Sequence, residues 1–221
     1  MLKHTGAAFG LLILPGCKRH NSGKTAQYNP NGEDAITFVR KLPPATQPCI
    51  DVVVRPWVVP IKQPSNNTCW AAVWTMMASW RKGQRFTIEA AVKELGSDWM
   101  NHLKRDEGLE AQTFTEQSFL QASGLKSKPP ANYLPSAYVE LLASHGPLWV
   151  NTGDGILNHA TLLVAAHTRD DGQIDFQFAD PKLGDFITKS DAVFFKEFED
   201  EARFIVDRHL NWDLRFQIFY W

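Results

Sequence analysis

Apolar residues follow a helical pattern in the first half of the chain and a strand pattern in the second half. Residues 69–80 contain no glycine or proline and are apolar nearly all round, which predicts a buried helix that begins at Cys69. Beyond Gly146, short apolar runs alternate with turn residues, which is typical of strands. Further helices are expected over residues 87–95, 115–122 and 135–144. Strands are expected over residues 51–54, 57–59, 148–150, 161–165, 174–178, 186–187, 203–206 and 214–219.

This order of elements, helices first and a sheet second, predicts an α+β domain. We expect the domain to span residues 50–221, with an N-terminal helical lobe and a C-terminal lobe of antiparallel sheet. Asp170, Asp171 and Gly172 favour a hairpin turn between two of the strands. The acidic tract 197–201 is expected to be the solvated face of a helix.

The first 17 residues have the pattern of an export signal, with Lys3 ahead of an apolar stretch over residues 6–14. Because this stretch ends in Leu-x-Gly-Cys, it resembles a bacterial lipoprotein signal in which Cys17 becomes the acylated first residue. Pro15 departs from that motif, and an ordinary N-terminal segment is the alternative. Residues 18–49 are polar and predict a flexible spacer. We therefore expect the protein to be exported, and then secreted or lipid-anchored at Cys17 in the cell envelope.

Composition narrows the classes of partner. The chain has 221 residues, 44% of them hydrophobic, which excludes a disordered protein and allows one substantial core. Its 23 basic and 24 acidic side chains nearly cancel, so the positive surface that nucleic-acid binding requires is not expected. No apolar run approaches the roughly 20 residues that cross a bilayer as a helix, which argues against a polytopic membrane protein.

The three cysteines, Cys17, Cys49 and Cys69, are too few for a disulfide framework and do not form a C-x-x-C pair. Cys69 stands at the start of the predicted helix, where free N–H groups and the helix dipole stabilise a thiolate. It is therefore a candidate nucleophile. The alternative is a small buried core residue.

The sequence around Cys69 favours the nucleophile. Gln63 stands six residues before Cys69, and Trp70 follows it directly. This arrangement resembles the papain superfamily of cysteine proteases. The resemblance implies a papain-like two-lobed fold whose central helix begins at the catalytic Cys69. It also implies that the Gln63 amide and the Cys69 backbone N–H form an oxyanion hole.

The same resemblance implies a histidine at the start of a strand in the C-terminal half, followed one strand later by Asn or Asp. His159 and Asp180 occupy such positions in the required order. His159 would act as general base and then general acid, and Asp180 would orient its imidazole. Among the six other histidines, His167 at the far end of the same predicted strand is the main rival, and we expect it to be a surface residue.

Two features distinguish the chain from papain itself. Asp180 replaces the usual Asn, and the stretch from Cys69 to His159 is short. Both resemble the compact bacterial branch that includes secreted effector proteases. The function expected is a cysteine peptidase that cleaves protein or peptide substrates through a thioester on Cys69, with no metal or organic cofactor. A cognate inhibitor protein is a further partner left open.

Two alternatives stay open at this point. One is a papain-fold amidase or acyltransferase that acts on peptidoglycan or glutamine side chains. The other is a papain-fold module that binds a partner without catalysis.

Overall fold

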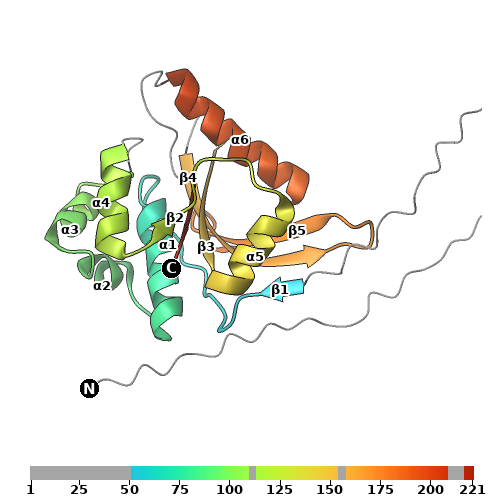
Figure 1. The fold of residues 1–221 in the computed structure, drawn as a ribbon. Helices are drawn as coiled ribbons and strands as arrows, with labels where there is room; N and C mark the ends of the chain where they lie inside the picture. The colour runs from blue at the N-terminus through green and yellow to red at the C-terminus, as the bar shows by residue number, and fades with distance from the viewer. Residues whose placement is uncertain (1–50, 110–112, 154–157, 209–216) are drawn as a thin grey trace, which may run out of the picture.

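Helices and one antiparallel sheet make up the fold (Figure 1). The computed structural model describes residues 51–109, 113–153, 158–208 and 217–221, so the expected signal and spacer over residues 1–49 lie outside the described residues. The helices are α1 (Cys69–Lys82), α2 (Ile88–Lys93), α3 (Ser97–Lys104), α4 (Thr113–Ser123), α5 (Pro135–His145) and α6 (Asp191–Arg208). The strands are β1 (Asp51–Val53), β2 (Lys126–Ser127), β3 (Leu148–Gly153), β4 (Asn158–Thr168), β5 (Ile174–Asp180), β6 (Asp185–Ser190) and β7 (Ile218–Tyr220).

The sheet has the order β2-β7-β3-β4-β5-β6, and every pair in it is antiparallel. β4 lies between β3 and β5, and its far end also pairs with β1. In Figure 1, α2, α3 and α4 gather on one side of α1, while α5 and α6 lie with the sheet. The α+β class with an antiparallel sheet is confirmed, and the division into two separate lobes stays a prediction.

Helix α1 is the centre of the core, as its apolar sequence predicts. It begins at Cys69, and Trp74 and Trp80 on it are almost fully buried. The helix stops at Gly83, whose positive φ lets its N–H bond back to the last turn. At its end, the ring of Trp80 lies against Gly146, where an added Cβ would stand 2.2 Å from the ring. This close contact joins the end of α1 to the turn between α5 and β3.

Two of the expected strands are wrong. Residues 57–59 form no strand, because the flanking prolines Pro56 and Pro60 lack the N–H groups that a sheet needs. Residues 203–206 belong to α6, where the buried Phe194 and Phe198 recur at helical spacing and set the structure of the whole segment.

The acidic tract 197–201 is helical as expected, but it is not wholly solvated. Phe198 and Glu201 within it are buried. The tract therefore contributes to the core as well as to the surface.

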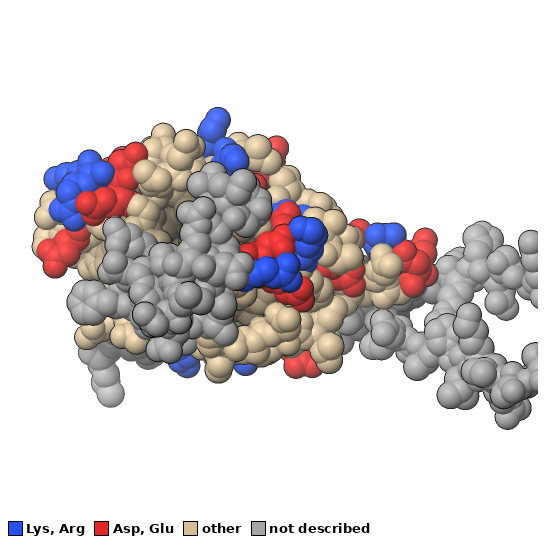
Figure 2. Space-filling model, turned by 90° about the horizontal axis from the view of Figure 1, so that it is seen from above, with Lys and Arg blue, Asp and Glu red and all other residues tan. Residues whose placement is uncertain are grey.

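The surface carries both charges. Figure 2 shows basic and acidic side chains close together on the face seen there, in keeping with a net charge of −1. Within the described ranges, no helix is both long and apolar enough to cross a membrane. Among the same residues, no group of three or more His, Cys, Asp or Glu side chains is arranged to hold a metal ion.

Candidate active site

The pairing of β4 with β5 brings His159 and Asp180 to one face of the sheet. His159 is the second residue of β4, and Asp180 is the last residue of β5. Since Leu162 pairs with Ala179, Asp180 stands opposite residue 161, two residues from His159 and on the same side of the sheet. The result is a hydrogen bond of 2.7 Å between His159 Nε2 and Asp180 Oδ1.

The other partner of His159 is the side chain of Cys69. Helix α1 packs against β4, so the thiol at the start of the helix meets the imidazole at the start of the strand. Burial alone would lower the pKa of His159, but hydrogen bonds with Asp180 and Cys69 outweigh it and raise the pKa to about 9. Since Nε2 bonds to Asp180, Nδ1 is the nitrogen left for the thiol. The imidazole therefore bridges Cys69 and Asp180 and holds a proton at neutral pH.

Asp180 is held as an ionised acceptor. Burial works to raise its pKa, but the hydrogen bond and the charge of His159 outweigh that effect and keep the pKa below its usual value. The backbone N–H of Lys182 also donates to Asp180 Oδ1 over 2.8 Å, and only 7% of Asp180 is exposed. A buried carboxylate with two donors has a fixed position, so it can orient the imidazole.

Gln63 lies in the loop that leads to α1. Its Nε2 donates to the Ser65 carbonyl over 2.6 Å, and its Oε1 is buried with no hydrogen-bond partner among the described residues. A side-chain amide nitrogen carries two hydrogens, so one N–H remains beyond the bond to Ser65. The structure does not show the role expected for Gln63, and that role stays a prediction.

The Gln63 loop is also attached to the turn that carries Asp180. The N–H of Gln63 donates to the Pro181 carbonyl over 2.8 Å. In the same turn Gly184 has a φ of +72°, and a Cβ there would stand 2.7 Å from Lys62 Cβ. The loop before Cys69 and the end of β5 therefore form one packed unit, which sets where Gln63 lies relative to Asp180.

The comparisons with known proteins agree with this geometry. Residues 54–201, more than half of the chain, match the family described as papain-like cysteine protease AvrRpt2. The chain belongs to this family. The expected resemblance to an effector-type branch of papain-like cysteine proteases is thereby confirmed. None of the curated proteins compared with the chain matches it.

The rival histidine, His167, lies apart from the site. In this member of the AvrRpt2 family, His167 lies at the far end of β4, is half-exposed, and pairs with Asp51 on β1 at 2.5 Å. Cys17 and Cys49 lie outside the described residues. Of the expected site residues, the structure brings Cys69, His159 and Asp180 together and places Gln63 on the loop that precedes Cys69.

The sequence reasoning missed the residues that hold the Gln63 loop. Thr68 is the N-cap residue of α1, but its side chain makes no cap hydrogen bond. Its Oγ1 instead donates to the Ser65 carbonyl over 3.1 Å, and it accepts from the Ser65 N–H. Ser65 in turn bonds to Asp106, which is far away in the sequence. The only signal was a run of small polar residues ahead of Cys69, which is common in any loop.

Proposed function

We propose that the protein hydrolyses peptide bonds through a thioester on Cys69. His159 transfers the proton, and Asp180 orients the imidazole. The observation that carries the proposal is the bridging position of His159, which hydrogen-bonds both Cys69 and Asp180 at the start of α1. Membership of a cysteine protease family supports the same reaction.

The steps follow from the positions of these groups. The Cys69 thiolate attacks the peptide carbonyl carbon, and the carbonyl oxygen becomes an oxyanion. The N–H of Cys69, one of the helix N–H groups with no intrahelical acceptor, and the second Gln63 amide N–H stabilise that oxyanion. The His159 imidazolium then protonates the leaving amine. Water next attacks the thioester with His159 as base, which releases the acid and restores the Cys69 thiolate and the His159 imidazolium.

Substrate assays separate this reaction from its alternatives. We expect the purified protein to cleave members of a quenched fluorescent peptide library. We expect it to release no fragments from purified peptidoglycan and to join no amine to glutamine side chains of proteins. Cleavage of peptidoglycan alone would favour the amidase, and amine incorporation alone would favour the acyltransferase. Inactivity in all three assays, with a Cys69 inert to a peptidyl epoxide, would favour a binding module.

Replacement of Gln63 tests the oxyanion hole. Gln63→Ala is expected to lower kcat by about 10²–10³-fold and leave KM within a few fold, because the amide meets a charge only in the transition state. Steady-state kinetics on a library peptide measures both constants. Alkylation of Cys69 by a haloacetamide forms no oxyanion and provides the control, so its rate is expected to stay near that of the wild type. A normal kcat would make Gln63 a loop residue only.

The alkaline limit of activity tests the link between Asp180 and His159. Because the pKa of His159 is raised to about 9, the imidazolium persists below that pH, and kcat/KM is expected to fall as pH rises through it. Asp180→Asn removes a carboxylate that raises this pKa, so the alkaline limb is expected to move to lower pH. A profile of kcat/KM against pH for both proteins measures the shift. Coincident alkaline limbs would contradict the role given to Asp180.

A further inference from the structure

Helix α3 ends in a turn that carries an unusual residue. The N–H of Asp106 bonds to the Leu103 carbonyl over 3.1 Å, and the N–H of Glu107 bonds to the His102 carbonyl over 3.2 Å. These two bonds define a Schellman motif, whose left-handed position is most often glycine. Here the position is held by Asp106, with a φ of 56°, the one residue other than glycine with a positive φ among those described. A side chain in this conformation is strained, so its presence calls for a compensating contact.

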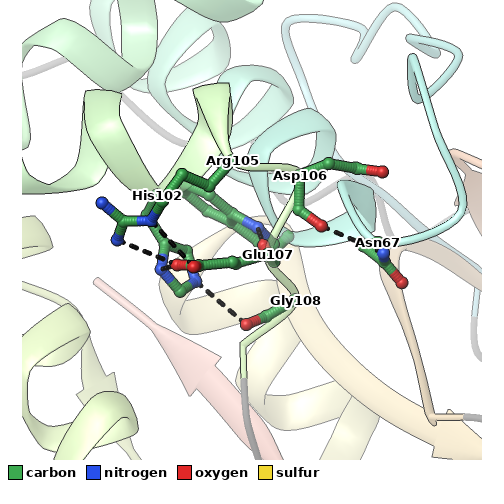
Figure 3. A network of polar contacts seen from close by, with 7 residues as sticks. Asn67, His102, Arg105, Asp106, Glu107 and Gly108 are labelled. Atoms are coloured by element: carbon green, nitrogen blue, oxygen red, sulfur yellow. Dashed lines mark hydrogen bonds and ion pairs between the residues drawn. The ribbon is translucent and has the colours of Figure 1, made fainter.

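That contact is with the loop before Cys69. The Asp106 carboxylate accepts a hydrogen bond from Ser65 Oγ, and the Asp106 carbonyl accepts one of 3.0 Å from Asn67 Nδ2. Figure 3 shows Asn67 beside Asp106, with a dashed line marking their hydrogen bond. The carbonyl of the same Ser65 accepts the Gln63 amide. Asp106 is therefore two hydrogen bonds away from Gln63.

The turn that carries Asp106 is itself held firmly. The Glu107 carboxylate accepts two hydrogen bonds from Arg105, of 2.8 and 2.9 Å, and pairs with His102 Nδ1 at 2.8 Å (Figure 3). His102 Nε2 lies 2.9 Å from the Gly108 carbonyl. The indole N–H of Trp70, the residue after Cys69, donates to the Glu107 carbonyl over 3.0 Å. The turn is thus attached to α1 through Trp70, the residue after Cys69.

We propose that Asp106 is a positioning residue of the active site: its carboxylate, through Ser65, holds the loop from Gln63 to Cys69 so that the Gln63 amide faces the developing oxyanion. This inference rests on the proposed function and adds a residue to it. The Asp106 carboxylate touches no reacting atom and acts through Ser65. A misplaced donor reduces the stabilisation of the transition state more than it reduces substrate affinity. The loss of the carboxylate therefore lowers kcat more than it changes KM.

Two substitutions at position 106 separate the carboxylate from the backbone. Asp106→Gly keeps the left-handed turn without strain but removes the acceptor. It is expected to lower kcat about 10–100-fold with KM within a few fold, while the midpoint of thermal unfolding does not fall. Asp106→Asn keeps an oxygen acceptor and tolerates the same φ, so it is expected to retain most of the activity. A normal kcat in Asp106→Gly would overturn the proposal, and so would equal losses in the two variants.

Ser65→Ala tests the path from Asp106 to Gln63. It breaks the same hydrogen bond from the other side, so its effect on kcat is expected to resemble that of Asp106→Gly. The double variant is expected to lose little more than either single variant, because the two residues act through one bond. Additive losses would show that Asp106 acts by another route.

Amide hydrogen exchange measures how firmly the loop is held, and it does not depend on catalytic turnover. In Asp106→Gly, the backbone amides of Ser65 and Thr68, both hydrogen-bonded within the loop, are expected to exchange about 10-fold faster than in the wild type. The Gly184 amide, bonded to the Asp180 carbonyl in the neighbouring turn, provides the control and is expected to keep its rate.

The two readouts separate the inference from the proposed function. Suppose that the loop amides exchange faster in Asp106→Gly but the wild type cleaves no peptide. This result would show that Asp106 holds the loop and would contradict the proposed function. Unchanged loop exchange would overturn the inference whatever the wild-type activity.

Discussion

Cys69→Ala is expected to abolish peptide hydrolysis while the domain stays folded. The substitution removes the nucleophile, and in a related type of catalytic site such a loss lowers kcat by about 10⁶-fold. Folding is expected to survive because Cys69 is only partly buried at the first position of α1, and the fully buried Trp70, Met76 and Met77 that hold this helix are unchanged. Turnover of the best library peptide measures the first effect, and circular dichroism with a thermal scan measures the second.

The other two cysteines supply matched controls. Cys17→Ala and Cys49→Ala each remove a thiol, and both variants are expected to cleave the peptide at the wild-type rate. Peptide cleavage that persists in Cys69→Ala would contradict the mechanism, and cleavage lost only in one of the control variants would assign the nucleophile elsewhere.

His159→Ala is expected to have the second largest effect, a loss of about 10²–10⁴-fold in kcat. It removes the group that takes the thiol proton and returns it to the leaving amine. His167→Ala is the matched control, because His167 lies on the same strand and also pairs with an aspartate, Asp51. That pair is half-exposed and lies at the opposite end of β4, so kcat is expected to stay within a few fold of the wild type. Kinetics of both variants on one peptide makes the comparison.

The reverse result, with His167→Ala inactive and His159→Ala active, would mean that the wrong end of β4 was assigned to the site. Equal losses in the two variants would show instead that both substitutions act through the stability of the strand. A thermal scan of each variant tests for that loss of stability.

Much of the fold could be predicted from local patterns. Helix α1 was predictable because residues 69–80 have no helix breaker and are apolar on every side. The strand wrongly expected over 203–206 shows the limit of local patterns, since Arg203 and the three apolar residues after it have no clear period of their own. The helical spacing of Phe194 and Phe198 in the preceding turns decides the structure of that segment.

The candidate site was predictable in part for a different reason. The order of Gln63, Cys69, His159 and Asp180 along the chain carries the resemblance to papain-like proteases, and a single turn between β4 and β5 brings His159 near Asp180. The contact of Ser65 with Asp106 has no such local signal. It joins residues 41 positions apart and depends on a backbone conformation that an aspartate rarely adopts. Only the packing of α3 beside α1 reveals it.

Covalent labelling provides the direct test of Cys69 as a nucleophile activated by His159. The protein is treated with a peptidyl vinyl sulfone, and mass spectrometry of its fragments locates the adduct. We expect one adduct per chain, on Cys69, with Cys17 and Cys49 unmodified and with labelling greatly slowed in His159→Ala. An adduct on another residue, or labelling of Cys69 at the same rate without His159, would contradict this role of Cys69.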